Sequence, residues 1–382
     1  MKSLRVNTPG VDFLTAMEAV LASLFMLFLA QPGQALHAYG HAYSRPHDFT
    51  DAQISAVAAR FEIFTVEKGS AQDIYGPRSS IAATIATAKR IKAVNDNVKV
   101  LMYWNAAMHY DMYECETEVQ PSWLIPGPGH HKQAFYNYSV SAFREWWVRC
   151  ALTAVARSGG LLSGVFLDAT PKVADGQCYT KGPMALAYWG SMVDQIRAEL
   201  GPDAVVIDNG FFLAGKYPHN IQLAGMDAWK HSGTTYTESV AAVGMDKAVN
   251  PEKDIADLRW IAEASASAPS SLQMIGHGTF CSDGVDHNDN SSSALDPEFE
   301  FGLAKYLLVT RTVQDGWFLA NCNYSIDGGL LQQPMRAYGS AGLGCGEPIG
   351  PFVRTDHVLS RAFEHGNVSV DIRNGTGSIR CE

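Results

Sequence analysis

Charged residues are scarce in this chain of 382 residues, and basic residues are scarcer than acidic ones. Only 18% of the residues are charged, and 29 basic against 39 acidic side chains give a net charge of −10. A duplex nucleic-acid binder needs a basic face, and docking on an anionic membrane needs basic side chains as well. The charge balance therefore predicts no nucleic-acid partner and no membrane-surface partner.

The chain also lacks the short motifs of several enzyme classes. It has no Cys-x-x-Cys pair, no HExxH, no GxxxxGK[ST] and no GxSxG, and no GxGxxG follows its first predicted strand. These absences argue against zinc ribbons, zinc hydrolases, nucleotide binding and an α/β-hydrolase triad. The stretch Asp283–Asn290 offers oxygen ligands, but Ser291 and Pro297 stand where a calcium loop needs Gly and Glu. We therefore predict no metal and no cofactor.

Long apolar runs are missing except at the N-terminus. There Lys2 and Arg5 precede the apolar run Val20–Ala30, and small residues follow at positions 33–35. Eleven residues are too few to span a bilayer, which takes about 20, but they suit the core of a signal peptide. Residues 1–35 are thus predicted to be a signal peptide of a secreted protein, with an uncleaved signal anchor as the alternative.

Two further features agree with secretion. Five Asn-x-Ser/Thr sequons make the chain a predicted glycoprotein: Asn137, Asn290, Asn323, Asn367 and Asn374. Seven cysteines follow the leader: Cys115, Cys150, Cys178, Cys281, Cys322, Cys345 and Cys381. In an oxidising compartment we expect three disulfide bonds and one free thiol, with the pairing left open.

Short β-branched or aromatic runs recur along the chain, and most are separated by amphipathic stretches. The predicted strands are His37–Tyr43, Phe61–Glu67, Val98–Asn105, Gly164–Asp168, Ala204–Asn209, Gly233–Glu238, Leu272–His277 and Gly316–Asn321. The predicted helices are Asp51–Arg60, Ser79–Val94, Ser139–Ser158, Gly182–Leu200, Pro251–Ala266 and Pro297–Thr312. No helix is predicted within Phe211–Ser232. Eight such units favour an α/β fold, a closed (β/α)8 TIM barrel over residues 36–345.

The C-terminal segment has a different pattern. Val358–Cys381 contains three short strand-like runs, which Gly-Asn and Asn-Gly turn signals separate. Residues 346–382 are therefore predicted to form a small antiparallel β module beside the barrel.

Polar side chains end most of the predicted barrel strands. They are Glu67, Asn105, Asp168, Asp208 with Asn209, Glu238, His277 and Asn321. The active sites of TIM barrels lie at this end of the strands. A buried, unpaired carboxylate is costly, so several such groups at one mouth indicate a hydrogen-bonding pocket rather than a structural feature. Only one of Asp208 and Asn209 can point inward, because side chains alternate along a strand.

Asp168 is the strongest candidate for a catalytic residue, because it ends a predicted buried strand on the face that also carries Phe166. Glu238 has a similar context. Two facing carboxylates are what cleavage of a glycosidic bond requires, one as nucleophile or base and the other as acid. Trp104, next to Asn105, offers an aromatic surface on which a sugar ring could stack.

The runs that carry these residues resemble a known family of barrel enzymes. FEIFTVEKG, VKVLMYWN, GVFLDATP, VVIDNGFF and GTTYTESV, with the tail PIGPFVRTDHVLSRAFEHGNVSVDIRNGTGSI, resemble hypothetical glycosyl hydrolase family fifteen. More distantly they are similar to α-galactosidase and polygalactosaminidase-type barrels. The resemblance implies a glycoside hydrolase with a retaining mechanism, Asp168 as nucleophile and Glu238 as acid/base. The polar strand-end residues and Trp104 are expected, from their positions in the sequence, to hold a carbohydrate substrate: Glu67, Trp104, Asn105, Asp208, Asn209, His277 and Asn321.

Two other functions stay open at this point. A catalytically inactive barrel that binds glycans, or serves as a cell-surface structural protein, would not need two facing carboxylates. A metal-dependent hydrolase would lose its activity in the presence of a chelator.

Overall fold

The structure is a computed structural model, and it describes residues 37–45, 47–127, 133–174, 183–210, 219–237, 250–278, 297–312, 316–320, 324–326 and 344–381. Several predictions concern other residues and lie outside this set. They are the leader, Glu238, Asn321, the Asp283–Asn290 stretch, the sequons Asn290 and Asn323, and Cys178, Cys281 and Cys322.

The predicted barrel is confirmed. Its eight strands are β1 (His37–Ala42), β2 (Ile63–Val66), β3 (Lys99–Asn105), β6 (Leu162–Asp168), β7 (Val205–Asp208), β8 (Thr234–Thr237), β9 (Gln273–Gly278) and β10 (Gly316–Ala320). Every neighbouring pair is parallel, and β1 pairs with both β2 and β10, so that the sheet closes on itself. All eight strands therefore end at one mouth of the barrel.

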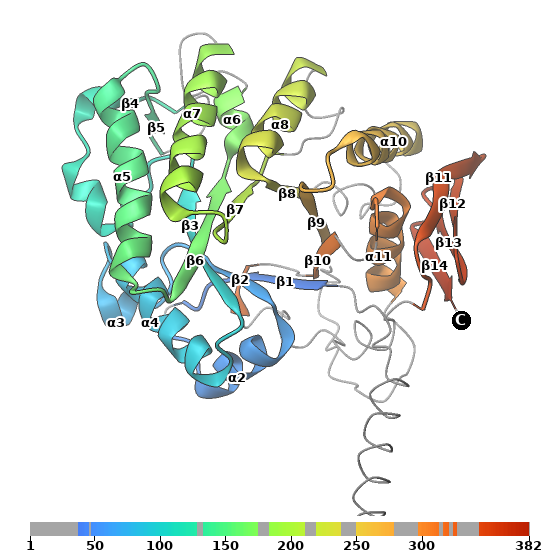
Figure 1. Cartoon of the computed structure of the whole chain (residues 1–382), viewed down its shortest axis with the longest axis horizontal. Helices are drawn as coiled ribbons and strands as arrows, with labels where there is room; N and C mark the ends of the chain where they lie inside the picture. Colours follow the sequence, from blue (N-terminus) through green and yellow to red (C-terminus); the bar gives the residue numbers. More distant parts are fainter. Residues whose placement is uncertain are drawn as a thin grey trace, which may run out of the picture.

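Helices connect the strands and surround the barrel (Figure 1). They are α2 (Asp51–Arg60), α3 (Gln72–Tyr75), α4 (Ser80–Val94), α5 (Ser141–Arg157), α6 (Thr170–Ala174), α7 (Pro183–Leu200), α8 (His219–Ser232), α10 (Pro251–Ser267) and α11 (Pro297–Val309). The boundary of α2 follows from its sequence, because Thr50 and Gln53 form a capping box. Within the described ranges, none of the helices is both long and apolar enough to cross a membrane.

One sequence prediction about the helices is wrong. The sequence predicts no helix between β7 and β8, yet α8 occupies His219–Ser232. This segment contains Gly225 and several polar residues of modest helix propensity. Burial of Ala228 and Trp229 accompanies its packing, so tertiary contacts stabilise a helix that the local sequence only weakly favours.

In the described residues of the long connection from β3 to α5, all elements are short. Two 3₁₀ helices, η1 (Glu114–Glu118) and η2 (Pro121–Trp123), precede the small antiparallel pair of β4 (Leu124–Ile125) and β5 (Phe135–Tyr136). A disulfide bond between Cys115 and Cys150 ties η1 to α5. This connection therefore forms an ordered layer beside the mouth of the barrel.

The C-terminal segment forms a separate antiparallel sheet. Its strands, in spatial order, are β11 (Pro348–Thr355), β12 (Val358–Phe363), β13 (Gly366–Asp371) and β14 (Thr376–Cys381). The predicted antiparallel module is confirmed, with β11 as an additional strand. Pro348 and Pro351 obscure this strand in the sequence, although proline is tolerated at the edge of a sheet, where β11 lies.

The sheet packs against α11 and faces away from the α2–α5 side of the barrel (Figure 1). Its buried residues Leu359, Val368 and Val370 join a hydrophobic cluster with residues of α10 and α11. The larger cluster fills the barrel and the space beneath α2, α4 and α5. The molecule thus has two hydrophobic clusters among its described residues, and α11 faces the sheet from the barrel side.

Candidate active site

Asp168 ends β6 at the mouth, and its carboxylate accepts hydrogen bonds from two neighbouring strands. On β3, the Tyr103 hydroxyl donates to Oδ2, and the Asn105 amide nitrogen lies 3.1 Å from the same atom. Beyond β7, the Asn209 amide nitrogen donates to Oδ1 over 2.8 Å. Asp168 is partly exposed, whereas Tyr103, Asn105 and Asn209 are buried. The carboxylate is therefore held by three donors and still open to a ligand.

The chemistry of Tyr103 fixes its role as a donor. Burial raises the pKa of Tyr103 well above its usual value, and the nearby charges of Asp168 and Glu67 raise it further. The hydroxyl therefore keeps its proton across the physiological range. The hydroxyl also accepts a hydrogen bond of 2.9 Å from Asn105. This bond holds the two side chains in position for their contacts with Asp168.

Asn105 is itself held by the backbone that follows β3. Its side-chain oxygen accepts hydrogen bonds from the Ala107 and Met108 amides, at 2.9 and 2.6 Å. These contacts orient the amide so that its nitrogen points at Asp168 and Tyr103. The Trp147 indole on α5 donates to the Asn105 carbonyl over 3.0 Å, which anchors the strand end to the surrounding helix.

Glu67 follows β2 and forms a second buried charged group at the mouth. Its carboxylate pairs with Nζ of Lys68 and lies 2.6 Å from Nε2 of His41 on β1. Burial raises the pKa of Glu67, but the charge of Lys68 and the hydrogen bonds from His41 and Lys68 outweigh it, so the pKa is below its ordinary value. Glu67 is therefore an anion at neutral pH.

Aromatic rings lie beneath and beside these polar groups. Phe166 on β6 stacks with Tyr39 and Tyr103 at centroid distances of 6.4 and 6.0 Å, and the His41 ring meets it edge-on at 4.7 Å. The hydroxyl of Tyr39 bonds to Thr65 over 2.7 Å. The interior below the mouth is therefore packed with side chains, as in other TIM barrels.

His277 lies on β9, three strands from Asp168 on β6 in the order of the barrel. Its ring centroid is 5.9 Å from that of Tyr324, which in turn lies 4.6 Å from His41. Tyr324 thus connects the predicted residue His277 to the His41–Glu67 pair. The structure brings together five of the predicted residues: Glu67, Asn105, Asp168, Asn209 and His277.

Two predicted residues lie elsewhere, and side-chain alternation is the reason. Trp104 points out of the barrel into the core under α5, where it contacts Tyr113, Trp146 and Trp147 and has no exposed surface. It cannot stack on a sugar in this position, so its predicted place in the pocket is corrected.

Asp208 also points away from the mouth, while Asn209 points inward. The Ser232 hydroxyl at the end of α8 donates to Oδ1 of Asp208, and Oδ2 has no hydrogen-bond partner among the described residues. Burial raises the pKa of Asp208 to about 7. Its predicted contact with substrate is corrected as well, because it lies between the barrel and α8.

Sequence reasoning misses three members of this site: His41, Lys68 and Tyr103. His41 and Tyr103 precede the strand ends by one or two residues and share the inward face, a signal that alternation could supply. Lys68 follows Glu67, and its ammonium group lies over the Tyr103 ring at 4.0 Å. Only the folded barrel shows that contact, because Lys68 and Tyr103 belong to different strand–helix units.

Comparison with known proteins identifies the chain. The model of hypothetical glycosyl hydrolase family 15 matches residues 92–367. The chain belongs to this family. It is a glycosidase, as the sequence resemblance implied. Comparison with curated proteins finds no match.

Solved structures of α-amylases share the fold of this family member. A noncanonic maltogenic α-amylase from Thermotoga neapolitana is 11% identical, with a TM-score of 0.51 over 89% of this chain and 86% of that one. An α-amylase from Lactobacillus plantarum is 10% identical, with a TM-score of 0.52 over 89% and 88%. At such identities the similarity establishes the fold alone.

Proposed function

We propose that this glycosidase is secreted and cleaves a glycosidic bond in a polysaccharide or glycan through two carboxylates, with retention at the anomeric carbon. Asp168 is the nucleophile and Glu238 the acid/base. The observation that carries the proposal is the Asp168 carboxylate, partly exposed at the mouth and held by donors from Tyr103, Asn105 and Asn209.

The geometry around Asp168 suits a nucleophile. One carboxylate oxygen must attack the anomeric carbon while the glycosidic bond breaks, and water must then release the sugar from the ester. The donors hold the carboxylate in one orientation before substrate arrives, which lowers the cost of reaching the transition state. The Asn209 contact to Oδ1 and the Tyr103 and Asn105 contacts to Oδ2 leave one lone pair, on Oδ1, for the attack.

The acid/base must carry a proton when the leaving oxygen departs. Glu67 is a poor candidate, because Lys68 and His41 lower its pKa and keep it ionised. Glu238 directly follows Thr237, the last residue of β8, and β8 lies two strands from β6 in the barrel. The end of β8 lies at the same end of the sheet as Asp168, and the chain order that puts Glu238 directly after it supports Glu238 in this role.

The remaining polar residues of the mouth bind substrate hydroxyl groups. Glu67 offers acceptors, and Asn209 and His277 offer donors and acceptors around Asp168. Asn105 contributes by holding Asp168, because its amide group is already hydrogen-bonded to Tyr103, Asp168 and the backbone that follows β3. Asn321, which directly follows β10 in the chain, is included on its sequence position. Trp104 and Asp208 are excluded because both are buried on the outer face of the barrel.

Secretion is supported by the predicted leader and by two disulfide bonds, Cys115–Cys150 and Cys345–Cys381. The sequon residues Asn367 and Asn374 are both exposed on the C-terminal sheet. Expression in a eukaryotic secretory host should therefore yield a chain without residues 1–35, and its mass should fall when N-glycans are removed enzymatically. A chain that stays membrane-bound with its leader intact would contradict this part of the proposal.

The test of the mechanism is sugar release from a panel of plant, algal and bacterial polysaccharides. We expect release by the wild type and a loss of about 10³-fold or more in both Asp168→Asn and Glu238→Gln. Asp203→Asn, an exposed carboxylate that precedes β7 at the opposite end of the barrel, is the matched control and should retain full activity.

Each outcome of this experiment bears on one part of the proposal. A covalent glycosyl adduct trapped on Asp168 and detected by mass spectrometry would establish the nucleophile and the retaining course. Undiminished release by the variants would place the catalytic pair elsewhere in the mouth. Glycan binding without any release would instead indicate an inactive, glycan-binding barrel.

A further inference from the structure

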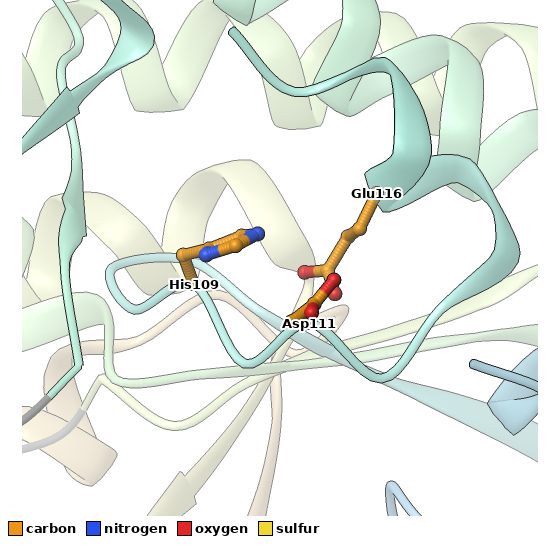
Figure 2. Close-up of side chains that lie close together, drawn as sticks. All are labelled: His109, Asp111 and Glu116. Atoms are coloured by element: carbon orange, nitrogen blue, oxygen red, sulfur yellow. The ribbon is translucent and has the colours of Figure 1, made fainter. Parts of the chain in front are cut away.

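A group of potential metal ligands lies outside the mouth, on the connection that follows β3. One ring nitrogen of His109 and one carboxylate oxygen each of Asp111 and Glu116 lie within 4.8 Å of one another. Figure 2 shows the three side chains converging from two adjacent turns of this connection. The sequence predicts no metal, because no spacing motif marks these three residues.

The imidazole of His109 carries an unexplained polar atom. Its Nε2 is buried and has no hydrogen-bond partner among the described residues. Figure 2 shows the ring directed toward the two carboxylates. A buried nitrogen without a partner costs free energy, and such an atom in a folded protein usually indicates a ligand or a bound water.

Glu116 is held in place as metal-binding carboxylates generally are. Its Oε2 accepts hydrogen bonds from the Met112 and Tyr113 amides, at 2.6 and 3.3 Å, and its Oε1 accepts one of 2.9 Å from the Tyr136 hydroxyl. Oε2 accepts two hydrogen bonds, whereas Oε1 accepts one and keeps a lone pair for a metal.

Asp111 lies on the solvent-exposed side of this three-residue group. Arg78 donates to both of its oxygens, at 2.6 and 2.7 Å, and about half of the Asp111 side chain is exposed. Each carboxylate oxygen accepts one contact from Arg78 and keeps a further lone pair, and hydrogen bonds of this kind orient ligating carboxylates in many metal sites. With the Arg78 charge included, the two carboxylates leave one net negative charge that attracts a divalent ion.

We propose that His109, Asp111 and Glu116 bind one divalent transition-metal ion, with water completing its coordination on the exposed side. One imidazole and two carboxylates form a donor set that suits Zn²⁺ or Mn²⁺, whereas Ca²⁺ and Mg²⁺ prefer oxygen alone. The site is distinct from the mouth and does not depend on the proposed hydrolytic mechanism.

The ion would stabilise the wall of the mouth. Tyr110 lies between two of the ligands, and its ring is 4.6 Å from Nζ of Lys68, the partner of Glu67. Binding of the ion by His109 and Asp111 would therefore restrain Tyr110 in its contact with Lys68. On the other side of the loop, the Cys115–Cys150 disulfide already restrains the neighbour of Glu116.

The test is calorimetric titration of the metal-free full chain with ZnCl₂. We expect one ion per chain, with affinity at least about 10-fold weaker in His109→Ala and in Asp111→Asn. Asn tolerates the left-handed backbone at position 111, where φ is 54°, so the second variant keeps the fold. The exposed residues His365 and Asp73 give the matched controls His365→Ala and Asp73→Asn, which should bind as the wild type does.

A second measurement separates binding at this site from adventitious binding. Zn²⁺ should raise the melting temperature of the wild type and of both controls, and much less that of His109→Ala or Asp111→Asn. CaCl₂ should give a smaller shift than ZnCl₂. The proposal is overturned by an absence of saturable one-to-one binding, by affinity that survives in both ligand variants, or by an equal loss in the controls.

Discussion

At the scale of single residues, the hydroxyl of Tyr103 and the carboxylate of Asp168 form the contact closest to the proposed chemistry. The change Tyr103→Phe removes one donor and keeps the ring that stacks on Phe166. We expect kcat/KM to fall about 10- to 100-fold with the fold unchanged, because a charge-assisted hydrogen bond contributes about 1.5–3 kcal/mol. Initial-rate measurements on the best polysaccharide of the panel check this.

Tyr138→Phe is the matched control for this variant. Its hydroxyl also donates a buried hydrogen bond, of 2.6 Å to the Ala106 carbonyl, but has no contact with Asp168. We expect it to lower stability without lowering kcat/KM. Equal losses of activity in the two variants would mean that Tyr103 acts through packing alone.

Asp208 gives a prediction about pH. Burial raises its pKa in the folded state from 3.8 to about 7, whereas the unfolded chain keeps the ordinary value. Neutral Asp208 therefore stabilises the fold fully below about pH 4, and this contribution is lost as the pH rises to about 7. Asp208→Asn removes the titration.

Relative to Asp208→Asn, the wild type should lose stability between pH 4 and pH 8, by on the order of 4 kcal/mol. Urea unfolding of both proteins at a series of pH values measures this difference, and other titrating groups cancel in it. A difference that does not change with pH would show that the Asp208 carboxylate ionises at its ordinary pKa in the folded protein.

The sequence locates strand ends well but the direction of side chains less well. The placement of Asp168 is correct because Phe166 sets the inward face two residues earlier. The placement of Trp104 is wrong because an aromatic residue suits both a sugar and a core, and composition does not separate the two. The His41–Glu67 pair joins residues 26 apart, and only the register of β1 with β2 brings them into contact.

At the scale of the elements, close packing of strands depends on a few glycines. Gly164 on β6 has a φ of 151°, and a Cβ there would lie 1.9 Å from the Val205 carbonyl oxygen on β7. Gly164→Ala should therefore destabilise the fold by more than about 3 kcal/mol, because it adds a backbone clash to conformational strain.

The variant Gly201→Ala measures the conformational strain of a positive φ without a backbone clash. Gly201 also has a positive φ, of 86°, but nothing lies within 4 Å of the place that a Cβ would take. We expect a loss of about 1–2 kcal/mol there. Urea unfolding measures both variants, and equal losses would show that β6 and β7 can separate without cost.

The order of strands and most helices follows from hydrophobic patterns, while α8 and β11 do not. Both of these elements are stabilised mainly by their neighbours, α8 by burial of Trp229 and β11 by pairing with β12. Hydrophobic patterns in a short stretch of sequence indicate the secondary structure that this stretch favours by itself. Such patterns fail where packing against neighbouring elements determines the secondary structure, as it does for α8 and β11.

At the scale of the whole molecule, the C-terminal sheet is joined to the barrel through α11. Gly377 on β14 allows this, because a Cβ there would lie 2.7 Å from the Cα of Phe301. Arg354 on β11 also pairs with Glu252 at the start of α10. The sheet is therefore part of the folded unit.

The disulfide bond between Cys345 and Cys381 closes a loop with a sequence separation of 36 residues around the sheet. Replacing both cysteines by serine should lower the free energy of unfolding by about 3–4 kcal/mol, since the unfolded chain regains the entropy of the open loop. Denaturant unfolding under non-reducing conditions measures the loss, and peptide mapping of the wild type verifies the pairing. Unchanged stability would contradict the prediction.

Closure of the barrel between β1 and β10 has a consequence for biosynthesis. His37 pairs with Trp317, so β1 cannot pair with β10 until about 280 further residues have been synthesised. At a synthesis rate of about 5–20 residues per second, this interval lasts roughly 14–56 seconds. Throughout that time β1 and the growing end of the sheet both present unpaired edges, which are prone to aggregate. Newly made chains should therefore depend on chaperones until the last barrel strand has emerged.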